Sequence, residues 1–186
     1  MKLKKPLSLV RALCLATAVC GSTGVAVAAS TNDAAATAPA AKQTLTLLGG
    51  PLTFTLDGYV ASAVPGGAPG TMYYSKAEKR VMIVGEEEIP LIGRGGTDDD
   101  VLDGLKGIKD QQKKASPDYK VISEKTENVN GLKVHHIEAT DNMDGNDVQQ
   151  ATLLATANNK IVVIQVISGS RDKAGHLAAV NNILRK

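Results

Sequence analysis

The sequence predicts an α+β domain with a mostly antiparallel sheet of six to seven strands flanked by two helices. Three observations support this class. Apolar residues alternate with polar ones in several short segments, asparagine-containing turns join consecutive segments, and two longer segments have helical periodicity. Short turns give antiparallel strand pairs, and an amphipathic helix needs a sheet face to cover its apolar side.

Nine elements are predicted, each bounded by turn-forming residues. The first strand shows the alternation clearly, because Leu52, Phe54 and Leu56 are separated by threonines. The glycine- and proline-rich stretch 58–70 is predicted to be a loop, and the glutamates after Gly85 are interpreted as the exposed end of a strand. The elements in chain order are strands at 51–56, 71–75 and 79–87, a helix at 97–117, strands at 119–129, 132–142, 147–157 and 160–168, and a helix at 171–186.

The first predicted helix has signals at both ends. Thr97 or Asp98 can cap its amino terminus, and Pro117 ends it. Acidic residues in the first turn, and Lys113 and Lys114 near the end, match the helix dipole. The face predicted to be buried carries Val101, Leu105, Ile108 and Gln112.

Two tight turns are predicted between strands in the second half of the chain. Asn130-Gly131 is a preferred dipeptide of hairpin turns, and Asn158-Asn159 tolerates positive φ at a second turn. The strand at 160–168 is nearly all apolar and is therefore predicted to be central and buried on both faces. Ser170 is the predicted N-cap of the last helix. The apolar stripe of that helix is predicted to carry Ala174, Leu177, Val180 and Leu184.

The amino-terminal segment 1–28 is predicted to be a cleaved export signal. A basic start and an apolar stretch precede Ala26-Val27-Ala28, which fits a signal-peptidase site. An uncleaved membrane anchor is the alternative, but glycine and polar residues at 21–24 interrupt the apolar stretch. Residues 29–44 are predicted to form a flexible tail and residues 45–186 a single domain. The basic residues of the signal are Lys2, Lys4, Lys5 and Arg11.

Lipid attachment at Cys20 is an alternative outcome of export. A bacterial lipoprotein signal has a small residue before the cysteine, and here that residue is Val19. The sequence therefore favours a soluble periplasmic protein over a lipid-anchored one. Both cysteines precede the predicted cleavage site, so a mature chain cut there has neither a disulfide nor a thiol nucleophile.

Cleavage after Ala28 changes the sign of the net charge. It removes four of the 21 basic residues and none of the 19 acidic ones, which leaves a formal charge of −2 instead of +2. Nucleic-acid binding needs a cationic surface, so that class is excluded. The sequence predicts no transmembrane helix in the mature chain, and no motif in it implies a cofactor.

The segment 133–147 concentrates potential metal ligands: two histidines, one glutamate and three aspartates. Neighbouring side chains of a strand point to opposite faces, so His135 and His136 cannot bind one ion together. His136 shares a face with Glu138, and His176 can join them only if the last helix packs over that face. Two ligands are too few for zinc, so neither a metal site nor a catalytic residue is predicted, and these three are the remaining candidates.

Other motifs do not supply an active site. Placing Gly145 at the sixth position of a calcium loop puts Thr140 first and Ala151 twelfth, where acidic ligands are required. A hairpin turn at 144–146 is predicted instead. A glycine-rich loop precedes the first helix, but aspartates 98–100 would repel a phosphate there. No G-x-S-x-G motif is present.

The order of these motifs resembles the DcrB family of bacterial envelope proteins, from about Leu47 to Leu184. The resemblance implies a PsbP-like α/β/α sandwich, and a role in envelope integrity and bacteriophage susceptibility without an established reaction. Some members look lipid-anchored, and Val19 before Cys20 departs from that pattern. The motifs that carry the resemblance are "GGPLTFTL", "KAEKRVMIVGEEE", "DQQKKASPDYKVISEK", "NVNGLKVHHIEA" and "ATLLATANNKIVVIQVI".

Together these observations predict a non-enzymatic periplasmic protein of cell-envelope maintenance. It is expected to bind an envelope protein or lipid partner through a sheet edge or a helix–sheet groove. The alternative is a small-ligand or lipid-binding module with a cleft between the loop Val64–Gly70 and the sheet. An enzyme that uses His136, Glu138 and His176 is the third hypothesis.

Overall fold

The computed structural model describes residues 42–91 and 94–185 of the 186-residue chain. The predicted export signal, Cys20 and most of the predicted tail lie outside the described residues. A strand begins at Gln43, so the last two residues of the predicted 29–44 tail belong to the domain.

The elements are β1 (Gln43–Leu47), β2 (Leu52–Leu56), β3 (Val60–Ala63), a 3-10 turn (Pro65–Gly67), β4 (Thr71–Ser75), β5 (Arg80–Glu88), α2 (Asp98–Leu105), α3 (Ile108–Ala115), β6 (Lys120–Val129), β7 (Leu132–Met143), β8 (Asn146–Ala157), β9 (Lys160–Gly169) and α4 (Lys173–Leu184).

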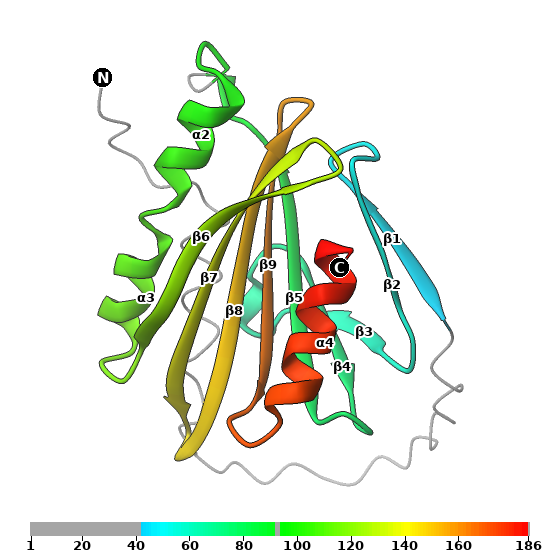
Figure 1. Ribbon diagram of the computed structural model, residues 1–186, viewed down its shortest axis with the longest axis vertical. Coiled ribbons are helices and arrows are strands. Elements are labelled where there is room, and N and C mark those ends of the chain that lie inside the picture. Colours follow the sequence, from blue (N-terminus) through cyan, green and yellow to red (C-terminus); the bar gives the residue numbers. More distant parts are fainter. Residues whose placement is uncertain (1–41, 92–93, 186) are drawn as a thin grey trace, which may run out of the picture.

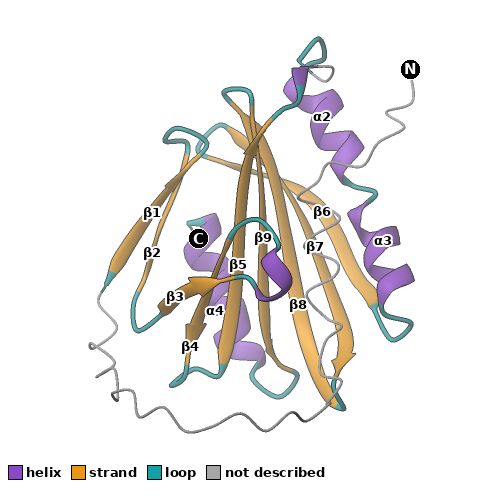
Figure 2. Cartoon of the chain, turned by 180° about the vertical axis from the view of Figure 1, so that it is seen from behind, coloured by secondary structure: helices purple, strands orange, loops and turns teal. Residues whose placement is uncertain are grey.

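Three layers build the domain (Figures 1 and 2). The middle layer is a seven-stranded antiparallel sheet in the order β3-β4-β5-β9-β8-β7-β6. α4 and the separate hairpin β1–β2 cover one face, where Phe54 and Val180 share a core. α2 and α3 lie on the other face, where Leu105 and Ile137 share a second core. The predicted α+β class with helices on both sides of an antiparallel sheet is confirmed.

The turns and the central strand agree with the sequence. Asn130-Gly131, Asp144-Gly145 and Asn158-Asn159 have positive φ at both positions, as hairpin turns of this kind require. β9 is the fourth of the seven strands and is almost wholly buried. No helix within the described residues is long and apolar enough to cross a membrane.

Two predicted elements are built differently in the structure, one because it contains a strand and the other because it is divided. The predicted loop 58–70 contains β3, which pairs with β4 at the edge of the sheet. This four-residue strand is too short to show an alternating pattern among the surrounding glycines. The predicted helix 97–117 divides into α2 and α3 at Gly107. Glycine is about 1 kcal/mol less favourable than alanine within a helix, which makes this the natural point of division.

The buried faces of the helices are also partly different from the prediction. α2 buries Leu102 with Leu105, while Val101 is only half-buried. In α4 the predicted stripe is wrong at Ala174 and Leu177, which are exposed, the latter to 56%. The residues that α4 buries are His176, Val180, Ile183 and Leu184.

The cap of α4 lies further along the chain than predicted. Asp172, and not Ser170, is the N-cap, because β9 continues to Gly169 and a turn follows before the helix starts. The Asp172 carboxylate accepts a hydrogen bond from the Gly175 amide at 3.0 Å.

The hairpin β1–β2 is attached to the main sheet through the backbone of Leu48. The Leu48 amide donates to Glu86 Oε2 at 2.6 Å, and its carbonyl accepts from Asn158 Nδ2 at 2.7 Å. Glu86 also accepts from Lys160 Nζ at 2.7 Å. The interpretation of the glutamates after Gly85 as a merely exposed strand end was therefore wrong for Glu86.

Replacing Glu86 by alanine should loosen this attachment, because the buried Leu48 amide loses its acceptor. We expect faster amide exchange over 43–56 and a loss of about 1–3 kcal/mol in the free energy of unfolding. Hydrogen exchange read by mass spectrometry measures the first effect and urea unfolding the second. Glu88→Ala, which removes an exposed ion pair with Arg94, is the control, and equal exchange in the two variants would contradict the attachment.

Candidate functional site

A chain of polar side chains crosses the sheet beneath α4. Arg80 on β5 stands opposite Ser168 on β9, which stands opposite Gln149 on β8. The Gln149 amide donates to the Asp172 carbonyl at 2.8 Å at the start of α4. Polar side chains thus occupy the part of this face that the amino-terminal half of α4 covers.

The three candidate residues from the sequence do meet. α4 packs against β8 and β9 on the same face of the sheet that carries His136 and Glu138 of β7, and this brings His176 to Glu138. His136 Nε2 lies 2.6 Å from Glu138 Oε1, and His176 Nε2 lies 3.2 Å from Glu138 Oε2. Each oxygen of the Glu138 carboxylate contacts a different imidazole. The three residues therefore form a chain of hydrogen bonds and do not converge on one point as metal ligands do. The described residues include no cluster of three or more histidine, cysteine or acidic side chains that could hold a metal ion.

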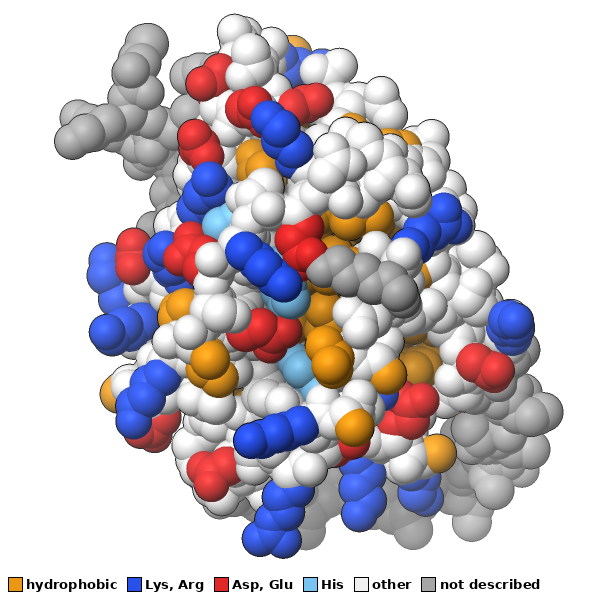
Figure 3. All heavy atoms as spheres, viewed as in Figure 1, with side chains coloured by type: hydrophobic (Ala, Val, Ile, Leu, Met, Phe, Trp, Pro, Cys, Tyr) orange, Lys and Arg blue, Asp and Glu red, His pale blue; other side chains and the backbone are white. Residues whose placement is uncertain are grey.

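Glu138 is held ionised by its two histidines. Burial opposes its charge, but the hydrogen bonds from His136 and His176 outweigh this effect and lower its pKa to about 2. The other nitrogen of His136, Nδ1, lies 3.2 Å from Glu127 Oε1 on β6. Histidine and acidic side chains accordingly lie next to one another on this face of the molecule (Figure 3).

The chain continues through Ser168. His176 Nδ1 lies 3.0 Å from Ser168 Oγ, and Ser168 Oγ accepts from Arg80 Nε at 3.0 Å. Serine, histidine and glutamate thus follow one another in the order of a hydrolase triad, which the sequence did not indicate. Ser168 is only 2% exposed and its oxygen already receives the Arg80 donor, so a substrate has no path to the hydroxyl. We therefore interpret Ser168 as a structural residue that connects His176 to Arg80 by hydrogen bonds.

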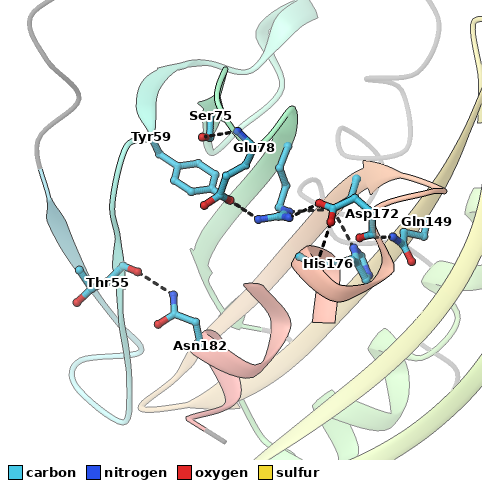
Figure 4. A network of polar contacts seen from close by, with 11 residues as sticks. Thr55, Tyr59, Ser75, Glu78, Gln149, Asp172, His176 and Asn182 are labelled. Carbon is cyan, nitrogen blue, oxygen red and sulfur yellow. Dashed lines mark hydrogen bonds and ion pairs between the residues drawn. The ribbon is translucent and has the colours of Figure 1, made fainter. Parts of the chain in front are cut away.

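Arg80 ends the chain in a cluster of four polar partners. Its side chain is 4% exposed, while those of Glu78 and Asp172 are about half exposed. It donates to Asp172 Oδ2 at 2.7 Å, forms an ion pair with Glu78 and lies 3.4 Å from the Tyr59 hydroxyl. Figure 4 shows Tyr59 beside Glu78, and Asp172 close to His176.

The charge of Arg80 is supported by these partners. Burial disfavours it, but Tyr59, Glu78 and Asp172 outweigh burial and raise the pKa of the guanidinium. Burial and a hydrogen bond to Glu78 raise the pKa of Tyr59 to about 12. Arg80 therefore keeps its charge and Tyr59 its proton across the physiological pH range. The sequence around Arg80 did not indicate that this residue is buried and paired, because Ser168 and Asp172 lie far away along the chain.

Gly175 provides the space for the ion pair between Arg80 and α4. A Cβ atom at this position would overlap Arg80 Nη2 and would lie 2.6 Å from Asp172 Oδ1. Only a residue without a side chain allows both groups to lie against the first turn of the helix. The glycine at 175 is thus required by a close approach and not by an unusual backbone angle.

An open groove of about 960 Å³ lies beside the Arg80 cluster. Its walls are the end of the hairpin β1–β2, the turn between β4 and β5, and the side of α4 that faces them. Charged residues surround it, and small and apolar side chains form part of its lining. The charged lining residues are Lys42, Asp57, Glu78, Lys79, Arg80, Arg171 and Asp172, and the remaining ones include Leu56, Tyr59, Met82, Gly175, Ala178, Ala179 and Asn182.

His135 lies on the opposite face of the sheet, as the alternation predicts. Its Nδ1 lies 3.0 Å from Thr126 Oγ1 and its Nε2 lies 3.0 Å from Glu124 Oε1. Burial lowers its pKa despite the nearby carboxylate of Glu124. Glu124 also pairs with Lys109 of α3, so His135 takes part in attaching α3 to the sheet.

The predicted cleft beside Val64–Gly70 does not coincide with the groove. Val64 is buried, and Gly70 lies so close to the Val84 carbonyl that a Cβ would approach it to 2.7 Å. No residue of this loop lines the groove at α4. Packing of the loop against the sheet explains the difference.

Comparison with known proteins supports the fold. No protein-family model and no curated protein matches the sequence. The solution structure of cyanobacterial PsbP (CyanoP) from Synechocystis sp. PCC 6803 is similar, with a TM-score of 0.56, 15% identity, and coverage of 83% of this chain and 95% of that one. LpqN, involved in cell envelope biogenesis of Mycobacterium tuberculosis, has a TM-score of 0.47, 12% identity, and coverage of 81% and 85%. The likeness to CyanoP shows a PsbP-like fold.

Replacing Glu138 by glutamine should remove a pH-dependent part of the stability. The folded pKa of about 2 lies below the ordinary value of 4.5, so the stabilisation is present above pH 4.5 and disappears as the pH falls towards 2. We expect the variant to lose about 2 kcal/mol at pH 7 and to have a flatter acid profile between these values. Urea unfolding at several pH values measures this. Asp118→Asn, at an exposed position, is the control, and parallel profiles for Glu138→Gln and the wild type would contradict the prediction.

Gly175→Ala should destabilise the protein although alanine favours helices. An exposed glycine-to-alanine change in a helix usually gains up to about 1 kcal/mol, and Gly104→Ala in α2, where a Cβ meets nothing within 4 Å, should show that gain. At Gly175 the new methyl group displaces Arg80 and Asp172. In an Arg80→Ala background the guanidinium, one of the two groups that the methyl group would overlap, is absent, and the cost should fall. A double-mutant cycle by urea unfolding tests this, and additive effects would refute the close approach.

Proposed function

We propose that the protein is a non-catalytic binding protein of the cell envelope that holds an envelope protein or lipid in the groove beside α4. One observation carries the proposal: an open groove, partly apolar, whose base holds a buried and fully paired arginine. Binding sites are commonly preformed concave surfaces with a few fixed polar groups among apolar ones. The ion pairs and hydrogen bonds of Arg80 supply that fixed polar part.

The state of the polar groups supports binding over catalysis. Each member of the chain from Glu127 to Arg80 is engaged by a neighbour, and the one hydroxyl nucleophile in it, Ser168, is buried. A catalytic group needs access to a substrate and a free acceptor or donor for the proton that it transfers. The charged side chains that border the groove can attract a ligand and hold it in position.

The place of action is proposed from the sequence. The export signal favours a soluble periplasmic protein, with lipid attachment at Cys20 as the alternative. The resemblance to the DcrB family adds a role in envelope maintenance and an influence on bacteriophage susceptibility. The alternative function is a small-ligand module, which the groove volume favours because about 300–1,000 Å³ is typical of ligand pockets.

Crosslinking from within the groove tests the proposal. A photoreactive amino acid at Ala178, which is exposed on the groove side of α4, should capture an envelope component in the producing cells. The same residue at Lys113, on α3 across the sheet, is the matched control. Mass spectrometry of both protein and lipid adducts identifies what is captured. The proposal fails if position 178 gives no adducts or gives the same adducts as position 113.

A further inference from the structure

We infer that the groove beside α4 takes an anionic amphiphile, a carboxylate or phosphate head group on a hydrocarbon body. This inference rests on the proposed binding function and names the chemical class of the ligand. Three features of the groove carry it: a surplus of unpaired cations at its rim, an apolar stretch along α4, and a closed end.

The rim has an excess of positive charge. Glu78 and Asp172 both pair with Arg80, whose single positive charge balances one of these two carboxylates. Within the described part of the chain, Lys42, Lys79 and Arg171 form no ion pair, and all three are exposed. Asp57 is the one acidic lining residue without an ion pair among the described residues. The lining as a whole carries four cations and three carboxylates, and this excess of one positive charge attracts an anionic group.

Part of the lining beyond the charged rim is apolar. Leu56 of β2 and Met82 of β5 are buried at the base, and Ala178 and Ala179 form the side of α4. These alanines are too small to fill the space between the helix and the hairpin. A hydrocarbon chain would cover this surface and would gain about 25 cal/mol for each Å² that it removes from water.

One end of the groove is closed by hydrogen bonds between α4 and β2. Asn182 Nδ2 donates to the Thr55 carbonyl at 2.7 Å, and Arg185 Nε donates to the Thr53 carbonyl at 3.0 Å. Figure 4 shows the link from Asn182 to Thr55, towards the other end of α4 from Asp172. Arg171 and the Arg80 cluster lie at the opposite end of α4. The groove thus has a charged end and a closed end, which suits a head group and a short hydrocarbon body.

Decanoate, used below its micellar concentration, is the probe of choice. It has the anionic head and the hydrocarbon body, whereas acetate lacks the body, decyl maltoside lacks the charge, and hexaglutamate has charges without the body. Isothermal titration calorimetry and amide NMR shifts should show decanoate bound at the groove and the other three compounds at least about tenfold weaker. Vesicles of phosphatidylglycerol and of phosphatidylcholine then separate a membrane lipid from a free acid as the source of the ligand.

Variants place the binding site. The double variant Lys79→Ala/Arg171→Ala should weaken decanoate binding about tenfold, and Ala178→Phe should abolish it by filling the exposed groove. The matched double variant Lys113→Ala/Lys114→Ala, at the end of α3, should bind as the wild type does. All of these positions are exposed, and thermal unfolding verifies that each variant folds.

The outcomes separate this inference from the proposed function. Decyl maltoside or hexaglutamate binding as tightly as decanoate overturns the inference, and so does unchanged binding by Ala178→Phe. If decanoate does not bind while crosslinking at position 178 captures an envelope component, the ligand class is wrong and the binding function stands. If crosslinking captures nothing, the binding function itself has failed.

Discussion

The orientation of α4 depends on the need to satisfy buried polar groups on the sheet. Glu138 and Ser168 project from β7 and β9 into the space that the helix covers, and His176 is the α4 side chain that meets both. A helix turned to bury Leu177 would gain about 1.5–3 kcal/mol for that side chain. Glu138 would keep only His136 and Ser168 only Arg80, so that Glu138 Oε2 and the Ser168 hydroxyl would each lose the contact with His176. A buried polar group left unsatisfied costs about 1–3 kcal/mol when it is neutral and more when it is charged. The polar contacts of His176 therefore decide which face of α4 is buried, and Leu177 stays exposed.

The same comparison explains how far the sequence could predict the structure. Strand alternation, the turn at Asn130-Gly131 and the burial of β9 are local properties, and the sequence predicted them. The opposite directions of His135 and His136 follow from the same alternation. The face of α4 is not local, because it depends on what β7 and β9 present to it. A hydrophobic stripe cannot reveal that a histidine is the residue to be buried.

The Arg80 cluster was also beyond local reasoning. Arg80 stands at the start of an apolar strand, where a basic residue is usually an exposed flank. Its partners Ser168 and Asp172 come from the last strand and helix. A buried ion pair contributes little net stability, because the loss of hydration offsets the attraction between the charges. We therefore interpret Arg80 as fixing the position of α4 along the sheet, since Asp172 and Ser168 each bond a different nitrogen of one rigid guanidinium.

The small residues of α4 connect this internal cluster to the surface of the molecule. Gly175 admits the Arg80–Asp172 pair, and Ala178 and Ala179 continue the same side of the helix past the hairpin β1–β2. Larger apolar side chains there would pack against Leu56 and close the groove, with a gain of about 1.5–3 kcal/mol for each one buried. The domain forgoes that packing energy on this side of α4, while Val180 and Ile183 on the other side are fully packed. A helix that served only to cover the sheet would not leave such a groove open, because filling it would stabilise the fold. An open groove that ends at the fixed charge of Arg80 is what a binding site requires.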